Sequence, residues 1–258
     1  MLKKRIIPVL LWKEFGLVKG KQFDSWRRVG SVLPSLRVYN TREVDELILV
    51  DITASSELKT PDFDSIRDFC HEISIPITVG GGIKSLEDVS KIIRGGADKV
   101  SLNTAAYQTP NLISEIAEVF GAQCVVVSID VKKNSDGRYE CYSHAGTNPT
   151  GHEVLSWAKK VESLGAGEIL LTSIDVDGTM EGYDLELINL VASHVKIPVI
   201  AAGGAGNYEH LLQAFQVGNA SAVAAASIFH FTEQTPLKAK SYLAAHGIPV
   251  RLKGLIST

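Results

Sequence analysis

Polar residues that could do chemistry occur where short apolar segments of this chain end. Carboxylates stand at Asp51, Asp130 and Asp177, and a positioned carboxylate can act as a general acid or base. Hydroxyl and amide groups occupy comparable positions at Ser101, Asn103, Thr104, Thr172 and Ser227. No histidine or cysteine near them has the spacing of a metal site or of an activated nucleophile. We therefore expect proton transfer and ligand binding, with no metal and no cofactor.

Two glycine-rich segments of the chain are near copies of each other. The segment IPITVGGG begins at Ile75 and IPVIAAGG begins at Ile197, 122 residues apart in a chain of 258. Each ends in glycines, including Gly82 and Gly204, before a helix-like stretch and a second apolar run. Glycines at such a place let backbone N–H groups approach an anion at a helix start. The repeat predicts two related halves and a ligand with two phosphates, although any single glycine could also be an ordinary turn.

Short apolar runs that recur along the chain are predicted to be strands. They cover residues 5–11, 46–52, 77–79, 99–102, 124–130, 168–173, 199–202 and 222–226. They are continuously apolar, which is typical of parallel strands buried on both faces, and amphipathic segments separate them. We predict a single domain over residues 1–258, an α/β (β/α)8 TIM barrel with an internal half-barrel duplication. An open doubly wound sheet is the competing topology.

The polar stretch at residues 131–150 contains the turn-like sequence KKNSDG, and it predicts a small insertion after the fifth strand. In a barrel of this kind functional groups gather at the carboxyl ends of the strands. The polar residues described above are therefore expected to share one mouth.

Composition limits the partners and the location. The net charge of −3 arises from 26 basic and 29 acidic residues without long blocks of one sign, so we expect neither a nucleic acid nor a membrane partner. The first apolar run is broken by Pro8 and favours a strand over a signal peptide. Cys70, Cys124 and Cys141 lack a disulfide-framework spacing, which suits reduced thiols and a cytoplasmic protein. Cys124 is expected to lie in a strand.

A family resemblance rests on several motifs together. They are RIIP from Arg5, DITAS from Asp51, VGGGI from Val79, GADKVS from Gly96, GAGEILLTS from Gly165, DGT from Asp177, GGAG from Gly203 and FHF from Phe229. Over residues 1–251 the chain resembles the cyclase subunit of imidazole glycerol phosphate synthase. That family implies a duplicated barrel of histidine biosynthesis. A glutaminase docks on its N-terminal face, and ammonia crosses the barrel to a substrate with a phosphate at each end.

The resemblance also implies roles for individual residues. Phosphate binding is implied for Gly82, Asn103, Thr104, Gly178, Gly204 and Ser227, and polar mouth positions for Asp51, Ser101, Thr172, Asp177 and Lys19. An ammonia gate at the barrel entrance is implied for Arg5, Glu46, Lys99 and Glu168. Charges inside a barrel are costly unless they are paired, so these four could equally be a structural salt-bridge cluster. Asp130 corresponds to one of the family's two catalytic aspartates.

The second catalytic aspartate of the family is replaced here. The family pattern Pro-Cys-Leu-Asp reads Pro8-Val9-Leu10-Leu11, and Leu11 can neither donate nor accept a proton. Loss of a positioned acid or base costs roughly two to four orders of magnitude in rate. Trp12 and Phe15 are expected to make the same mouth more apolar.

This departure resembles divergent paralogues found with surface-polysaccharide genes. There the barrel and its class I glutamine amidotransferase are thought to supply ammonia for converting an acetamido sugar to an acetamidino sugar on a third protein. The main hypothesis is thus an ammonia-conducting subunit with weak or absent cyclase activity, which works with a glutaminase and with a phosphorylated small molecule or a sugar-amidating enzyme. The alternatives are a functional cyclase in which Asp130 acts with Asp51 or Asp177, and a non-conducting scaffold that activates the glutaminase. The isomerase of the same pathway is disfavoured.

Overall fold

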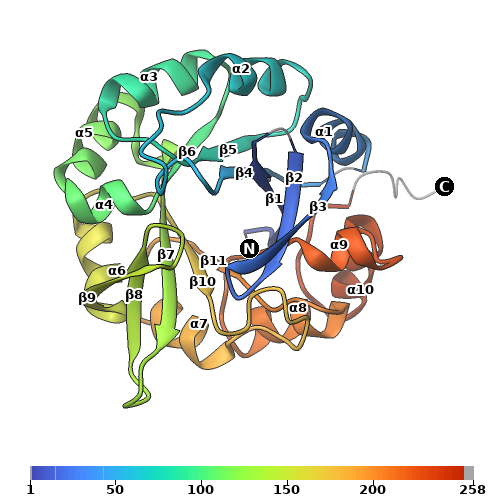
Figure 1. Cartoon of the computed structure of the whole chain (residues 1–258). Helices are drawn as coiled ribbons and strands as arrows, with labels where there is room; N and C mark the ends of the chain where they lie inside the picture. The colour runs from blue at the N-terminus through green and yellow to red at the C-terminus, as the bar shows by residue number, and fades with distance from the viewer. Residues whose placement is uncertain (1, 15, 43, 253–258) are drawn as a thin grey trace.

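The computed structural model describes residues 2–14, 16–42 and 44–252. A closed ring of eight parallel strands forms the centre (Figure 1): β1 (Arg5–Lys13), β4 (Leu47–Asp51), β5 (Ile77–Gly80), β6 (Lys99–Leu102), β7 (Val125–Lys133), β10 (Glu168–Ser173), β11 (Val199–Ala202) and β12 (Ala222–Ala225). The ring closes because β1 pairs with both β12 and β4. The predicted (β/α)8 barrel is confirmed, and the open sheet is excluded.

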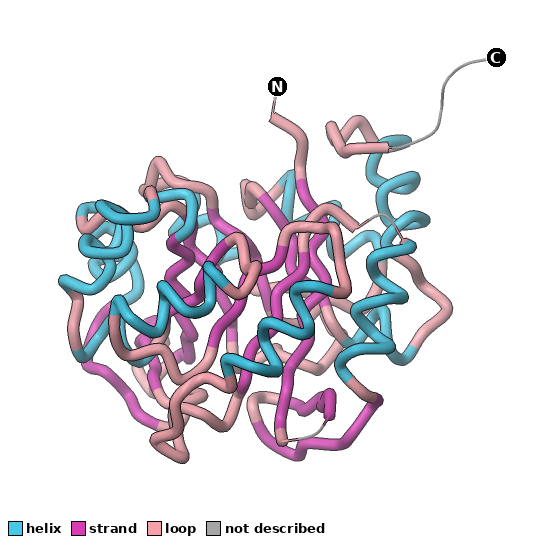
Figure 2. The backbone as a smooth tube through the Cα atoms, turned by 90° about the horizontal axis from the view of Figure 1, so that it is seen from above, coloured by secondary structure: helices cyan, strands magenta, loops and turns pink. Residues whose placement is uncertain are grey.

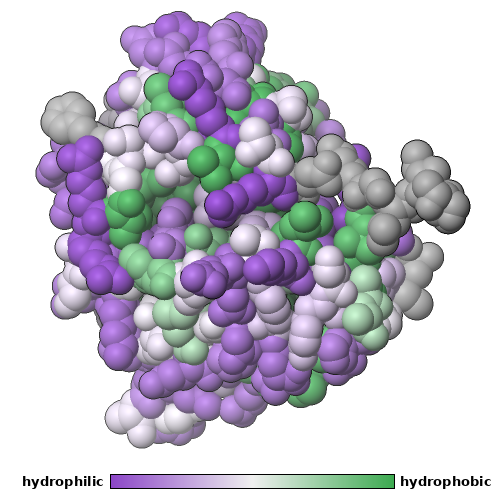
Figure 3. Space-filling view, turned by 90° about the vertical axis from the view of Figure 1, so that its right-hand side faces the viewer, coloured by the Kyte–Doolittle hydropathy of each residue, from purple (hydrophilic) through white to green (hydrophobic). Residues whose placement is uncertain are grey.

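Helices surround the barrel, as Figure 2 shows from a second direction. They are α1 (Val32–Thr41), α2 (Phe63–His71), α3 (Leu86–Arg94), α5 (Asn111–Phe120), α6 (Val154–Ser163), α7 (Leu185–Ala192), α8 (Tyr208–Gln216) and α10 (Pro236–Ala245). Each presents an apolar face to the strands, and the main core lies between these two layers. A second, smaller apolar cluster fills the barrel interior, with Ile7, Ile48 and Val126 among its members. On the side viewed in Figure 3, hydrophobic groups appear as separate patches among hydrophilic ones.

The two halves repeat each other in backbone detail. Thr78 of β5 pairs with Lys99 of β6, and the equivalent Ile200 of β11 pairs with Ala222 of β12. Two short helices follow these strand pairs, α4 (Thr104–Gln108) and α9 (Ser227–Phe231). The residues preceding these helices have similar dihedral angles, with φ −118° and ψ −81° at Asn103 and φ −130° and ψ −70° at Ala226. The predicted duplication is therefore visible in the structure.

Two strand pairs extend the barrel at its mouth. An antiparallel hairpin of β2 (Gly16–Lys21) and β3 (Asp24–Gly30) pairs with the end of β1. The insertion predicted at 131–150 contains β8 (Tyr139–Ser143) and β9 (Asn148–Glu153), with β8 paired to the extended end of β7. The hairpin of β2 and β3 was not predicted.

Two smaller expectations were wrong. Cys124 ends a 3-10 turn, η1 (Ala122–Cys124), and is half-buried rather than placed in a strand. Trp12 points outward from β1, where its ring meets Phe69 of α2 edge-on at 5.3 Å, so it belongs to the helix-facing core and does not line the mouth. Alternation along the strand explains this, because Leu11 faces inward. Phe15 lies outside the described residues. Within the described part of the chain, no helix has the length and apolar character needed to cross a bilayer.

Candidate functional site

A pocket at the carboxyl ends of the barrel strands brings together most of the polar residues predicted for the mouth. Its lining includes Asp51, Gly82, Ser101, Asn103, Thr104, Asp130, Thr172, Asp177, Gly178, Gly204 and Ser227. These residues come from strands or following loops distributed around the whole barrel. The sequence prediction of one shared mouth is therefore confirmed for these positions, while their roles stay predictions.

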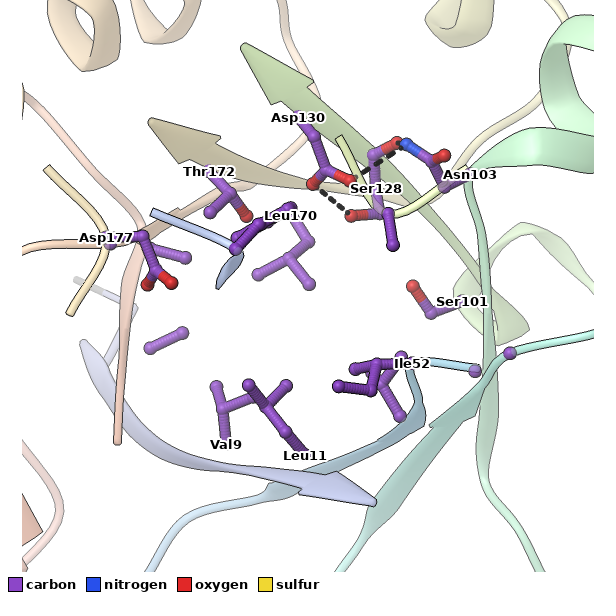
Figure 4. Close-up of a pocket in the computed structure, with 18 of the residues that line it drawn as sticks. Val9, Leu11, Ile52, Ser101, Asn103, Ser128, Asp130, Leu170, Thr172 and Asp177 are labelled. Carbon is purple, nitrogen blue, oxygen red and sulfur yellow. Dashed lines mark hydrogen bonds between the residues drawn. The ribbon is translucent and has the colours of Figure 1, made fainter. Parts of the chain in front are cut away.

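The pocket has two unlike walls, which Figure 4 shows facing each other. Val9 and Leu11 of β1, with Ile52 after β4, form an apolar wall. Asp130 of β7 and Thr172 of β10 stand opposite. The two glycine turns lie between these walls, since β5 and β6 separate β4 from β7, and β11 and β12 separate β10 from β1.

Asp130 is held by neighbouring side chains and is 7% exposed. Its carboxylate accepts hydrogen bonds from the Ser128 hydroxyl at 3.2 Å and from Asn103 Nδ2 at 3.2 Å. Burial raises the pKa of Asp130 from 3.8 to about 7, although the hydrogen bonds from Ser128 and Thr172 favour its ionised form. A carboxyl with this pKa can give or take a proton near neutrality.

Asp177 and Lys19 form the second group of titratable residues beside the pocket. Burial raises the pKa of the Asp177 carboxyl, and the charge of Lys19 and the Gly178 backbone N–H oppose this rise. Burial lowers the pKa of the Lys19 ammonium, while Asp177 opposes that change. Lys19 is 3% exposed, donates to the Val9 carbonyl at 2.9 Å, and lies behind the pocket wall instead of lining it as predicted.

The glycine turns after β5 and β11, and the short helices after β6 and β12, carry the residues predicted to bind anions, but packing also explains at least one of the glycines. Gly204 has φ +101°, and a Cβ there would lie 1.9 Å from the Gly182 carbonyl oxygen, so this glycine is required by packing in any case. The N-cap residues of α4 and α9 make no side-chain cap hydrogen bond, so the first backbone N–H groups of each helix have no acceptor from a cap side chain. The Asn103 side-chain amide donates hydrogen bonds to the Ser128 and Tyr142 carbonyl oxygens and to the Asp130 carboxylate.

Asp51 supports a loop as well as lining the pocket. Its Oδ1 accepts from the Thr53 backbone at 2.9 Å, from the Thr53 hydroxyl at 2.8 Å and from the Ala54 backbone at 3.1 Å. This arrangement stabilises the turn after β4. Asp51 is therefore a weaker candidate for proton transfer than Asp130 or Asp177.

The opposite end of the barrel carries the four charged residues predicted from the family resemblance. Arg5 Nη1 contacts Glu46 Oε1 at 2.7 Å and Glu168 Oε1 at 2.8 Å. Lys99 Nζ contacts Glu46 Oε2 at 3.0 Å and Glu168 Oε1 at 3.3 Å. Arg5, Lys99 and Glu168 are the first residues of their strands, and Glu46 immediately precedes β4. Two acids and two bases thus neutralise one another in a ring across the N-terminal end of the barrel.

Sequence reasoning missed the roof of the pocket. Phe23 and Trp26, from the hairpin of β2 and β3, line the pocket together with Ala145 of the insertion. The hairpin reaches the far side of the mouth, where the Gln22 backbone N–H donates to the Asp177 carbonyl at 2.8 Å. Apolar residues do not alternate regularly over residues 16–30, so no strong hairpin signal was available.

Comparison with known proteins agrees with the barrel and its pocket. The family model described as "Histidine biosynthesis protein" matches residues 5–235. Imidazole glycerol phosphate synthase subunit HisF of Chlorobaculum tepidum is 52% identical over 252 residues, covering 98% of this chain and 100% of the relative. The same subunit of Chlorobium luteolum is also 52% identical with the same coverage, and that of Chlorobium phaeobacteroides is 51% identical over 253 residues, again covering 98% and 100%. The chain therefore belongs to the histidine biosynthesis protein family and is similar over nearly its whole length to the HisF subunits of imidazole glycerol phosphate synthase.

Proposed function

We propose that this chain is an ammonia-conducting barrel subunit that works with a class I glutaminase and has weak or absent cyclase activity. The observation that carries the proposal is the position of Leu11, which faces Asp130 across the pocket (Figure 4). The family resemblance places a second catalytic aspartate at position 11. With leucine there, one of the two proton-transfer groups is missing while the rest of the pocket is retained.

The conduit part of the proposal is supported by the barrel interior. The ring of Arg5, Glu46, Lys99 and Glu168 lies at the N-terminal end, and an apolar cluster that includes Ile7, Val126 and Ala224 lies above it. An apolar interior favours a small neutral molecule over a charged one, because an ion pays a large desolvation cost there. Such an interior suits the passage of ammonia and opposes that of ammonium.

The acceptor of the ammonia is proposed to be a sugar of surface polysaccharide biosynthesis, amidated on a third protein. This part of the proposal is supported by the resemblance to divergent paralogues found with surface-polysaccharide genes, because this chain lacks the aspartate of the first strand. The named relatives are imidazole glycerol phosphate synthase subunits, and they support a second candidate, a functional histidine-pathway cyclase. The pocket position of Asp177 and its raised pKa favour that candidate, because Asp177 would be the available partner for Asp130.

Replacement of Asp130 tests the proposal. Asp130→Asn keeps the size of the side chain and removes the carboxylate, so glutaminase-dependent ammonia delivery should survive in the complex of this chain with its glutaminase. Robust cyclisation of the two-phosphate substrate by the natural chain, abolished in Asp130→Asn, would refute the proposal and establish the cyclase.

A further inference from the structure

Part of the apolar wall of the mouth is not packed into the apolar clusters of the barrel. Val9 and Val50 pack on the cluster that fills the barrel interior. Leu11 and Ile52 lie one residue pair nearer the opening and belong to neither packed cluster of the described residues. Both line the pocket and are half-buried. Their side chains therefore present apolar surface to the cavity itself.

Two aromatic rings cover the opening of the pocket. Phe23 and Trp26 line the pocket from the hairpin of β2 and β3, and both are half-buried. The ring of Trp26 lies on Gly20, where a Cβ would be 2.6 Å from it, so the hairpin fixes its position. Phe23 packs beside Gly146 of the insertion, so the roof reaches the side of the pocket opposite Leu11 and Ile52.

The facing side of the pocket carries polar groups beside Leu170. Asp130 and Thr172 face the apolar wall, and Asp177 adjoins them (Figure 4). The two glycine turns occupy the flanks between the walls. A ligand held by its ends at the two turns would therefore lie with one long edge on Leu11 and Ile52 and the other edge on Asp130 and Thr172.

We infer that the mouth selects a ligand with two anionic ends whose middle presents an apolar edge to Leu11 and Ile52. The inference rests on the proposed function, in which the two glycine turns keep the phosphate sites implied by the family resemblance, and it adds the chemistry of the middle. Removing apolar surface from water is favourable in proportion to its area. A ligand with a hydrocarbon middle gains from this contact, whereas a polyhydroxy or ether middle loses hydration on that edge without compensation.

Matched bisphosphates provide the test. Alkane-α,ω-diol bisphosphates and oligo(ethylene glycol) bisphosphates of equal chain lengths are titrated into the natural chain by calorimetry. At the length that binds best, the alkane series should bind at least about tenfold more tightly, with a more negative heat-capacity change. Leu11→Asp should abolish this preference, and Ile52→Asn should reduce it if the position-11 variant does not fold. Val38→Asp is the control, because Val38 is an aliphatic residue of α1 that is 43% exposed and outside the pocket.

The outcomes separate the inference from the function on which it rests. Equal affinity of the two series for the natural chain, or a preference that survives in both Leu11→Asp and Ile52→Asn, would overturn the inference and leave the two anion sites standing. That result is expected if the apolar wall serves only to continue the ammonia path. Failure of every length in both series to bind would overturn the anion sites of the proposed function and the inference with them.

Discussion

Leu11 and Asp130 lie on opposite walls of the same pocket, at the inner faces of β1 and β7 (Figure 4). One wall can exchange a proton near neutrality, because burial raises the pKa of Asp130 to about 7, and the other wall cannot. The pocket can therefore still bind a ligand, but it cannot supply an acid or base from both walls.

The raised pKa of Asp130 predicts a pH dependence of stability. The folded state binds the proton more tightly than the unfolded chain, whose carboxyl has a value near 3.8. The contribution of Asp130 to stability is therefore fully present below about pH 4 and is lost as the pH rises through 7. Between pH 5 and pH 8, the free energy of unfolding of the natural chain should fall relative to that of Asp130→Asn by about 2–3 kcal/mol. Urea unfolding measures this, and parallel pH curves for the two proteins would contradict it.

The charged ring predicts unequal effects of two lysine substitutions. Lys99→Leu leaves the Glu46 carboxylate with one partner fewer in a site where the side chains are 12–20% exposed, so it should destabilise the fold by about 1–3 kcal/mol. Lys91→Leu breaks the i,i+4 pair with Glu87, where both side chains are at least half exposed, and should cost less than about 0.5 kcal/mol. Thermal or urea unfolding distinguishes them.

The same Lys99→Leu variant separates a conduit from a scaffold. Lys99→Leu removes both ion pairs of Lys99 and disrupts the ring. It should reduce the share of glutamine-derived ammonia that reaches the mouth, measured with ¹⁵N-amide glutamine in the presence of unlabelled ammonium. If glutamine hydrolysis by the partner and the transfer of label were both unchanged, the conduit would be disproved.

Substitution of Gly204 in the second glycine turn should destabilise the protein through a packing clash, whereas the same substitution at Gly137 should cause no clash. Gly204→Ala places a Cβ 1.9 Å from the Gly182 carbonyl oxygen at φ +101°. It should lower the free energy of unfolding by several kcal/mol and should also weaken phosphate binding. Gly137→Ala also has a positive φ, +76°, but nothing lies within 4 Å of the added atom. Its cost should be about 1–2 kcal/mol. Comparable losses of stability in the two variants would refute the packing argument.

The hydrogen bonds of Asn103 connect the pocket to β8 of the insertion, so loss of its amide should affect both. Its amide donates to the Ser128 and Tyr142 carbonyls and to Asp130, so Asn103→Ala leaves several acceptors without this donor and should cost about 1–3 kcal/mol. Hydrogen exchange of the β8 amides should accelerate in the variant. Unchanged exchange in β8 would show that the insertion is held independently of Asn103.

The barrel and most of the pocket were predictable because parallel strands carry strong local signals. The eight apolar runs match the eight barrel strands closely, and β1 and β7 exceed the prediction only where antiparallel partners extend them to Lys13 and Lys133. Residues at strand ends followed from the topology, since a barrel brings those ends together.

The roof and the outward side of β1 were not predictable in the same way. Gln22, Phe23 and Ser25 adopt positive φ without being glycine, so the turn between β2 and β3 carries no glycine signature. Lys19 was expected at the mouth, but pairing of β2 with β1 buries it behind the wall. Trp12 was misplaced because the strand register that turns it toward Phe69 depends on tertiary pairing.

The most direct measurement compares the natural chain with Leu11→Asp in the cyclisation of the family's two-phosphate substrate. Excess ammonium salt at alkaline pH replaces the glutaminase, and substrate conversion is followed by absorbance. We expect weak or no turnover by the natural chain and turnover at least about a hundredfold higher in the variant. Turnover by the natural chain at a rate close to that of Leu11→Asp would contradict the proposed function and show that Asp130 suffices for a functional cyclase.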